Sequence, residues 1–174
     1  MYNTIKQFNL ETKIICIEPY PLPWLVAMDN QGIIELHISN LQNTNLELFK
    51  DLNKNDICFI DSSHVVKYNS DCLYYLNNIF PILKEGVLIH IHDIFLPYEY
   101  PSSWLKEGRF WNEQYFVYAF LMNNNKFIIR FANTYAQKFD KLLEIQKDSY
   151  EFKVIKDLDT SKPFGGGSLW LEVK

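Results

Sequence analysis

Short apolar runs that alternate with helical patterns constrain the fold of this chain most. Two of these runs, DICFID (56–61) and GVLIHIHD (86–93), are almost continuously apolar, which is typical of strands covered on both faces of a parallel sheet. Four further runs are short, rich in Ile, Phe or Leu, and bounded by turn residues. They are KIICIE (13–18), GIIELHIS (32–39), KFIIRFA (126–132) and GGSLWLEV (166–173).

Helical patterns occupy the segments between these runs. The clearest is NSDCLYYLNNIFPILKEG (69–86), where Asn69 or Ser70 can cap the helix and Pro81 bends its last turn. The others are NLELFKDLN (45–53), WNEQYFVYAFLMNNN (111–125) and AQKFDKLLEIQKDSYEF (136–152). Strands that alternate with helices predict an α/β fold with a mostly parallel sheet. No linker divides the chain, so we expect one domain over residues 1–174.

The composition excludes several classes of protein. The chain has 174 residues, 48% of them hydrophobic and 22% charged, which is typical of a globular protein. A net charge of −4 argues against a nucleic-acid binder, and no apolar run is long enough to suggest membrane insertion. Cys16, Cys58 and Cys72 are widely spaced in apolar stretches. We therefore expect buried free thiols and a cytoplasmic location.

Polar residues follow three of the predicted strands. Glu18 ends the first, the group Asp61-Ser62-Ser63-His64 follows the strand at 56–61, and His92-Asp93 ends the strand at 86–93. Ligands of parallel α/β sheets bind outside the carboxyl ends of the strands. These residues are therefore the candidate site, although Asp61, Ser62 and Ser63 are also suited to capping a turn.

The candidate site has the residue types of a cation site. Neighbouring parallel strands lie ~4.8 Å apart, so Asp61 and Asp93 can converge on one divalent cation such as Mg²⁺. His64 and His92 are then candidate bases, or additional ligands of a transition metal. Strict strand alternation puts His90 and His92 on one face and Asp93 on the other. We expect His90 to be a structural histidine, hydrogen-bonded under a helix.

An aromatic loop, FLPYEYPSSWLKEGRFW (95–111), follows the candidate site. Its aromatic residues have neither helical nor strand spacing, so the loop predicts either a lid with an acceptor pocket or a small core folded onto itself. The GGG run at 165–167 precedes a strand rather than a helix, which favours a flexible turn over a phosphate-binding loop.

Several motifs, in order along the chain, resemble a subgroup of class I S-adenosylmethionine-dependent methyltransferases. They are IEPYP (17–21), DICFIDSSHV (56–65), LKEGVLIHIHDIFLPYEYP (83–101), GRFWNEQY (108–115) and GGGSLWLEV (165–173). The resemblance implies a Rossmann-like fold, S-adenosylmethionine as cofactor and a small-molecule methyl acceptor. It implies that Glu18 binds the ribose, that Gln42 lies near the adenine, and that Asp61 with Ser62 borders the methionine end. It also implies a metal site at Asp61, His92 and Asp93, with His64 or His92 as the catalytic base.

One part of the family pattern has no counterpart in this sequence. The family's glycine-rich cofactor loop precedes the strand that ends in Glu18, whereas the first glycine here is Gly32. We therefore expect an N-terminally truncated methyltransferase domain, with a gap between the strands ending in Glu18 and Asp61. The alternatives are a non-catalytic remnant or subunit that needs a partner chain for the missing strand and, less favoured, a metal-dependent hydrolase.

Overall fold

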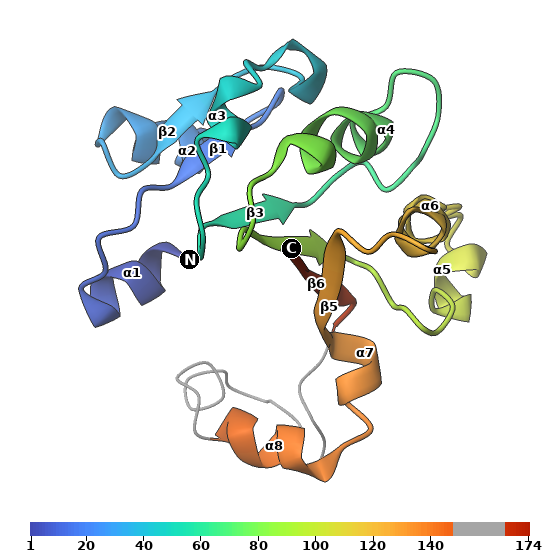
Figure 1. Cartoon of the computed structure of the whole chain (residues 1–174). Coiled ribbons are helices and arrows are strands. Elements are labelled where there is room, and N and C mark those ends of the chain that lie inside the picture. The colour runs from blue at the N-terminus through green and yellow to red at the C-terminus, as the bar shows by residue number, and fades with distance from the viewer. Residues whose placement is uncertain (148–165) are drawn as a thin grey trace. The chain divides into compact units, whose positions relative to one another are not determined.

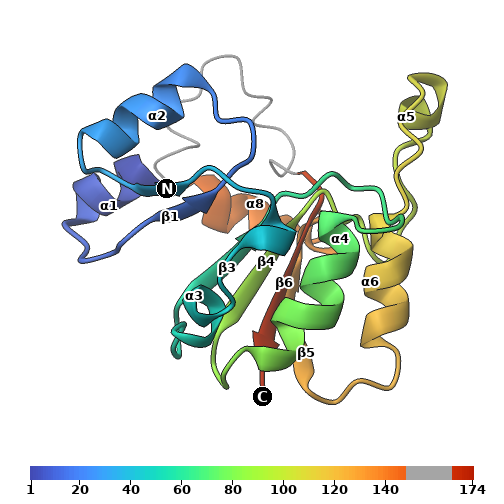
Figure 2. The same cartoon turned by 90° about the horizontal axis from the view of Figure 1, so that it is seen from above.

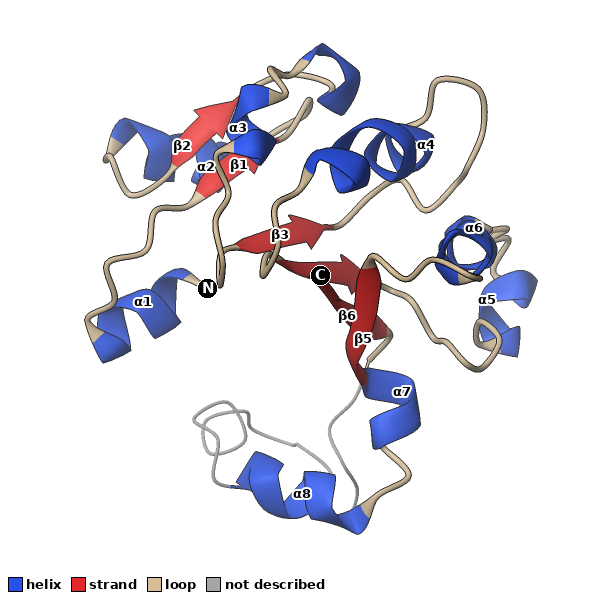
Figure 3. Cartoon of the chain, viewed as in Figure 1, coloured by secondary structure: helices blue, strands red, loops and turns tan. Residues whose placement is uncertain are grey.

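The structure is a computed structural model that describes residues 1–147 and 166–174. The chain divides into two compact units, Met1–Leu46 and Glu47–Lys174 (Figure 1). Their strands form two separate sheets, one of two strands and one of four (Figure 3). All six predicted strands are confirmed, and the α/β fold class with them. The expected single domain over residues 1–174 stays a prediction.

The first unit contains the two-stranded sheet. Strands β1 and β2 are parallel, with Ile15 opposite Glu35 and Ile17 opposite His37. Helix α2 begins with Pro23 at its first position. The backbone N–H that proline lacks would have no partner within the helix at that position, so proline is a favourable first residue. The elements are α1 (Tyr2–Phe8), β1 (Ile15–Ile17), α2 (Pro23–Asn30), β2 (Glu35–His37) and the 3₁₀ helix η1 (Leu41–Asn43).

The second unit contains the four-stranded sheet in the order β3-β4-β6-β5. Strands β3 and β4 are parallel, and β6 runs antiparallel to both of its neighbours. The strands are β3 (Ile57–Ile60), β4 (Leu88–His92), β5 (Phe127–Ala132) and β6 (Ser168–Val173). The helices are α3 (Glu47–Lys50), α4 (Asp71–Tyr74), η2 (Tyr75–Ile79), η3 (Phe80–Ile82), α5 (Ser102–Lys106), α6 (Glu113–Leu121), α7 (Asn133–Ala136) and α8 (Asp140–Lys147).

The predicted helix at 69–86 changes its winding twice. Ser70 caps it, accepting a hydrogen bond from the Leu73 N–H at 3.2 Å. One α turn is followed by a π segment, and a 3₁₀ turn at Phe80–Ile82 comes next. This turn contains Pro81, which was predicted to bend the end of the helix because proline cannot continue regular α-helical hydrogen bonding. The helix at 111–125 is confirmed as α6, and the helix at 136–152 is confirmed only to Lys147, because its end lies outside the described residues.

One face of the four-stranded sheet forms the core. Helices α4 and α6 lie side by side against it (Figure 2). The 3₁₀ turn η3 contacts α6 through Phe80 and Phe120, whose ring centroids are 5.8 Å apart. The sheet residues buried on this face are Cys58, Ile60, Ile89, Ile91, Phe127, Leu169, Leu171 and Val173. Burial of this apolar surface is the main stabilising contribution to the unit.

The opposite face of this sheet is only partly covered, unlike the two-sided cover predicted from the apolar runs. Ile57 is 50% exposed and Phe59 is 42% exposed. The ring of His90 stacks on Trp170 at 4.3 Å and meets the edge of Phe59. Its Nε2 is buried without a hydrogen-bond partner, so the expected hydrogen bond under a helix is wrong. Burial, with the neighbouring His92 charge, lowers the pKa of His90 to about 4.

The cysteine thiols provide a test of this core. Cys58 and Cys72 are buried, and burial raises the pKa of each to about 12, whereas Cys16 is only half-buried. Because the thiolate is the nucleophile, we expect iodoacetamide at neutral pH to alkylate Cys16 first, and Cys58 and Cys72 only after unfolding in urea. Mass spectrometry of timed samples measures this order. Native alkylation of Cys58 as fast as that of Cys16 would contradict the packing of β3.

Candidate functional site

The pairing of β3 with β4 brings two polar strand ends together. The strands are parallel and Ile60 lies opposite Ile91, so Asp61, which follows β3, lies beside His92, the last residue of β4. Asp93 comes next in the chain, and His64 returns from the loop after β3. We call Asp61, His64, His92 and Asp93 the strand-end cluster.

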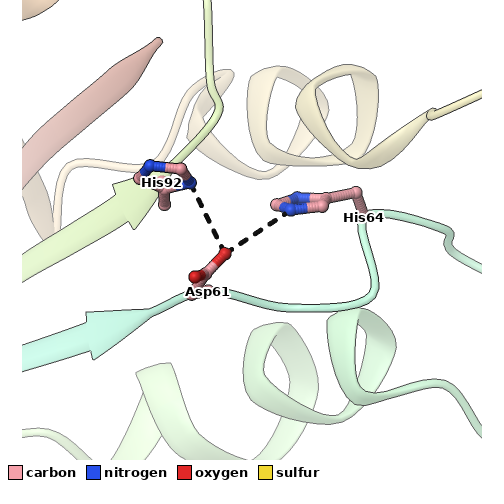
Figure 4. A group of neighbouring side chains, drawn as sticks. All are labelled: Asp61, His64 and His92. Atoms are coloured by element: carbon pink, nitrogen blue, oxygen red, sulfur yellow. Dashed lines mark ion pairs between the residues drawn. The ribbon is translucent and has the colours of Figure 1, made fainter. Parts of the chain in front are cut away.

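Short distances connect the members of the strand-end cluster, and Figure 4 shows three of them, Asp61, His64 and His92. His92 Nδ1 lies 3.4 Å from Asp61 Oδ1 and 3.4 Å from Asp93 Oδ2. His64 Nε2 lies 3.6 Å from Asp61 Oδ1 and 4.0 Å from Asp93 Oδ2. The predicted convergence of Asp61 and Asp93 on one site is therefore present, with an imidazole from each histidine facing both carboxylates.

Unusual backbone conformations turn two of these side chains toward the site. His64 has a φ of 58° and Asp93 a φ of 55°, in the left-handed region that non-glycine residues seldom adopt. Strand β4 ends at His92, so the alternation that would direct Asp93 to the opposite face no longer applies. Asp93 is held by its N–H, which donates to the Gly167 carbonyl at 2.7 Å. Such strain is concentrated at functional sites.

A buried carboxylate lies behind the cluster. Glu113, in the first turn of α6, has no exposed surface. Its Oε1 accepts hydrogen bonds from the Ser62 hydroxyl at 2.6 Å and the Tyr75 hydroxyl at 2.7 Å, and its Oε2 lies 2.7 Å from His64 Nδ1. A carboxylate only accepts, so Nδ1 carries the proton and donates it to Glu113. Glu113 thereby fixes the orientation of the His64 ring.

The residues on either side of Glu113 fix two loops to the start of α6. Asn112 accepts from the Val66 N–H at 2.6 Å, and its own N–H donates to the His64 carbonyl at 3.1 Å. Gln114 is buried, accepting from the Phe95 N–H at 3.1 Å and donating to the Tyr98 carbonyl at 3.3 Å. The loop after β3 and the loop after β4 are therefore held by three consecutive side chains.

The aromatic loop packs on itself and covers His64. Trp111 stacks on the His64 ring at 4.0 Å with an interplanar angle of 27°. Trp104 contacts Phe95 at 5.1 Å and Trp111 at 4.8 Å, and the Arg109 guanidinium lies over both indole rings. Of the two predicted roles, these contacts support the small folded core, with one wall of the site formed by Trp111.

Opposing effects determine the pKa of His64. Its burial alone would lower the pKa, but the hydrogen bond and charge of Glu113, together with the charges of Asp93 and Asp61, outweigh burial and raise it. Burial and the nearby Glu113 charge also raise the pKa of Tyr75 well above its usual value. Tyr75 is therefore a neutral hydrogen-bond donor to Glu113 at physiological pH.

The predicted cofactor residues lie in different parts of the chain. Glu18 follows β1, and its Oε1 accepts the Tyr20 N–H at 2.9 Å, as a turn-capping carboxylate does. Gln42 lies in η1, half-buried. Both belong to the unit Met1–Leu46, whereas Ser62 and the strand-end cluster belong to Glu47–Lys174. The Ser62 hydroxyl is engaged within the site, because it donates to Glu113 and accepts from the His64 N–H at 3.0 Å.

Sequence analysis missed Glu113, Tyr75 and the stacking of Trp111. The motif GRFWNEQY contributed only to the family resemblance, and the segment at 111–125 was predicted only to be a helix. A signal was present, because a glutamate beside Gln114 on the buried side of a helix needs compensating donors. Nothing local identifies those donors, since Tyr75 and His64 lie 38 and 49 residues away in the chain.

Two tyrosines with the same type of hydrogen bond test the importance of this network. Tyr75 donates to buried Glu113, and Tyr115, which is 47% exposed, donates to Glu99, each at 2.7 Å. We expect Tyr75→Phe to lower the free energy of unfolding by about 1.5–3 kcal/mol, because a buried charged acceptor loses a donor. Tyr115→Phe should cost less than about 1 kcal/mol in solvent. Urea melts measure both free energies of unfolding. Equal losses in the two variants would contradict the importance of the hydrogen-bond network around Glu113.

The structure contains no helix with the length and apolar character of a bilayer crossing among its described residues. Comparison with known proteins gave a family match. The match is to a family described as a methyltransferase domain and covers residues 1–94, which include the whole strand-end cluster and are more than half of the 174-residue chain. No curated protein and no solved structure matches the chain. The α/β fold, the parallel strand ends and this match together show that the chain belongs to a methyltransferase-domain family with a Rossmann-like fold.

Proposed function

We propose that the chain catalyses methyl transfer from S-adenosylmethionine to a small-molecule acceptor. Membership of a methyltransferase-domain family supports the reaction class. The observation that carries the proposal is the convergence of two imidazoles and two carboxylates where β3 and β4 end. Ligands of α/β sheets bind at this edge, and groups that can accept a proton are needed there.

Methyl transfer requires positioning and removal of one proton. The bond between the sulfonium sulfur and the methyl carbon breaks as the acceptor's oxygen or nitrogen forms a bond to that carbon, leaving S-adenosylhomocysteine. The acceptor's proton passes to a base, for which His92 and His64 are the candidates. His92 is the more accessible, because its side chain is 44% exposed, whereas His64 lies between Trp111 and Glu113. Alignment of the reacting atoms provides the remainder of the rate enhancement.

The proposed cofactor contacts are those that the family resemblance implies. Glu18 would accept hydrogen bonds from the ribose hydroxyls, with its orientation set by the Tyr20 N–H. Gln42 would lie near the adenine, and Asp61 would border the methionine end. The Ser62 hydroxyl already donates a hydrogen bond to Glu113. Ser62 would therefore contact the cofactor through its main chain, and through the position of the loop that carries it.

Removal of one histidine tests the proposed reaction. We expect His92→Ala to lower the rate of labelled-methyl transfer from S-adenosylmethionine by about 10²–10⁴-fold, the usual effect of a general base. Its affinity for the cofactor should be unchanged. The measurement is label incorporation over a panel of small hydroxyl and amine acceptors. His37→Ala, which removes an imidazole bonded to Glu35 in the other unit, is the matched control. Transfer that is equally fast in both variants would rule out His92 as the base.

A second candidate function is that of a subunit completed by a strand from outside this sequence. Strand β3 pairs only with β4 among the described strands, and its half-exposed Ile57 and Phe59 adjoin that open edge. An unpaired strand edge is a template for another strand. The first glycine of the sequence is Gly32, so a cofactor loop of the family type would also come from residues outside it, in the same or another polypeptide.

Addition of such a segment tests this candidate. We expect a family-type first strand with its glycine loop, fused before Met1 or added in trans, to increase the affinity for S-adenosylmethionine by about tenfold or more. The physical reason is that the loop supplies backbone N–H donors to the cofactor. Calorimetry measures the affinity, and a segment of the same length with its glycines replaced by alanine is the control. Equal affinities for S-adenosylmethionine with and without the segment would contradict this second candidate function.

A further inference from the structure

A pocket lies beside β5, the last strand of the four-stranded sheet. Helix α7 follows β5 directly in the chain (Figure 1). The pocket has a volume of about 420 Å³, within the range of about 300–1,000 Å³ that is usual for small-molecule sites. Its walls come from the loop after β4, from α6 and from the segment that runs from β5 into α7. The residues that line it include Leu96, Pro97, Leu121, Met122, Ile129 and Tyr135.

The walls of this pocket are almost wholly apolar. No charged residue is among its described lining residues, and their side-chain oxygen atoms are the hydroxyls of Tyr118 and Tyr135. Water in such a pocket has few hydrogen-bond partners, so its replacement by an apolar ligand is favourable. Ligands covered with polar groups are disfavoured, because those groups would lose hydrogen bonds to water without replacement.

The pocket lies where the core of the second unit ends. Ile129 is opposite Leu171 in the register of β5 and β6, so its side chain is on the same face of the sheet as the core. Leu171 is completely buried, and Phe127, two residues before Ile129, is 8% exposed, whereas Ile129 is 56% exposed. Tyr118 and Met122, on the α6 side of the pocket, are 57% and 58% exposed. Large apolar side chains that are exposed together typically mark a binding surface.

A cation lies next to these apolar walls. The Lys138 ammonium is 4.1 Å from the centroid of the Tyr98 ring. Pro97, which precedes Tyr98, lines the pocket, and so does Tyr135, whose carbonyl accepts the Lys138 N–H at 3.3 Å. Lys138 is exposed, and no carboxylate of the described residues pairs with it. An ammonium has three donors, so it can contact the ring and bind an anion at the same time.

We propose that this pocket binds a carboxylic acid with an apolar body, of the medium-chain fatty-acid type. The chain would lie between α6 and β5, where it covers Met122 and Ile129, and the carboxylate would pair with Lys138. Charge complementarity favours this ligand over a neutral lipid, which would leave the ammonium without an anion. The binding goes beyond methyl transfer and does not depend on it, because no lining residue belongs to the strand-end cluster.

A chain-length series tests the chemistry of the ligand. Calorimetry on the 174-residue protein, below the micellar concentration of each acid, should give one site per chain for hexanoate, octanoate and decanoate. Affinity should rise about tenfold for every two carbons, because each buried methylene contributes about fourfold. Decan-1-ol should bind about three- to tenfold more weakly than decanoate, since it lacks the charge. No binding of decanoate, or affinities that do not depend on chain length, would overturn the proposal.

Two substitutions in α6 and at its end locate the ligand. Met122→Glu should weaken decanoate binding by about tenfold or more, because it places a carboxylate in an apolar wall. The exposure of Met122 makes the fold tolerant of this change, and circular dichroism verifies it. Phe116→Glu is the matched control, since Phe116 is an exposed apolar residue of α6 outside the pocket lining. Undiminished binding by Met122→Glu would refute the assignment.

A lysine substitution tests the ion pair. Lys138→Gln should lower the affinity for decanoate by about three- to tenfold and leave that for decan-1-ol unchanged. Lys6→Gln is the control, because the Lys6 ammonium also lies over a tyrosine ring, that of Tyr2 at 5.4 Å, in the other unit. Equal losses for acid and alcohol in Lys138→Gln would refute the ion pair.

The oligomeric state tests a different occupant of the pocket. Analytical ultracentrifugation should give the same state for the parent protein and for Met122→Glu. A dimer that Met122→Glu dissociates, in a protein that does not bind decanoate, would show that a second copy of the chain covers the pocket, and would overturn the proposal.

Discussion

The buried carboxylate of Glu113 is the interaction on which the geometry of the site depends. It accepts from a residue of the loop after β3, from the π segment after α4 and from the ring of His64. A charged group without exposed surface is stable only when such donors surround it. Each donor is therefore constrained to one position, and the two segments that carry the donors, the loop after β3 and the π segment, are constrained together with α6.

The parallel register of β3 and β4 provides the other half of the site. It places Asp61 beside His92, and the end of the strand at His92 frees Asp93 to turn back toward both. The β3–β4 pair positions carboxylates and the start of α6 positions an imidazole against them. The carboxylates and the imidazole are thus positioned by different layers of the unit, so the site forms only when the helices have packed on the sheet.

This construction bears on the proposed reaction. Methyl transfer needs a place for the acceptor's proton, and the cluster offers carboxylate oxygens 3.4 Å from the imidazole nitrogen of His92. Glu113 would support that role, because its hydrogen bond holds the ring of His64 in one orientation beside Asp61 and Asp93.

The sequence by itself determined the elements and the residues that end them. Apolar runs of strand length identified all six strands, and Ser70 and Pro81 determined where one helix begins and where its winding changes. Asp61, His92 and Asp93 were identified as site residues, because a polar residue after an apolar strand is a local signal. Each of these features depends on near neighbours in the chain.

Only the tertiary structure decided how those residues face one another. The direction of Asp93 follows from a positive φ that no pattern encodes, and His64 is oriented by Glu113, 49 residues further along the chain. His90 stacks on Trp170 instead of hydrogen-bonding, because β6 enters the sheet beside β4. Periodicity reports which face of an element is buried, whereas the partner across a packed interface is set by the register and winding of other elements.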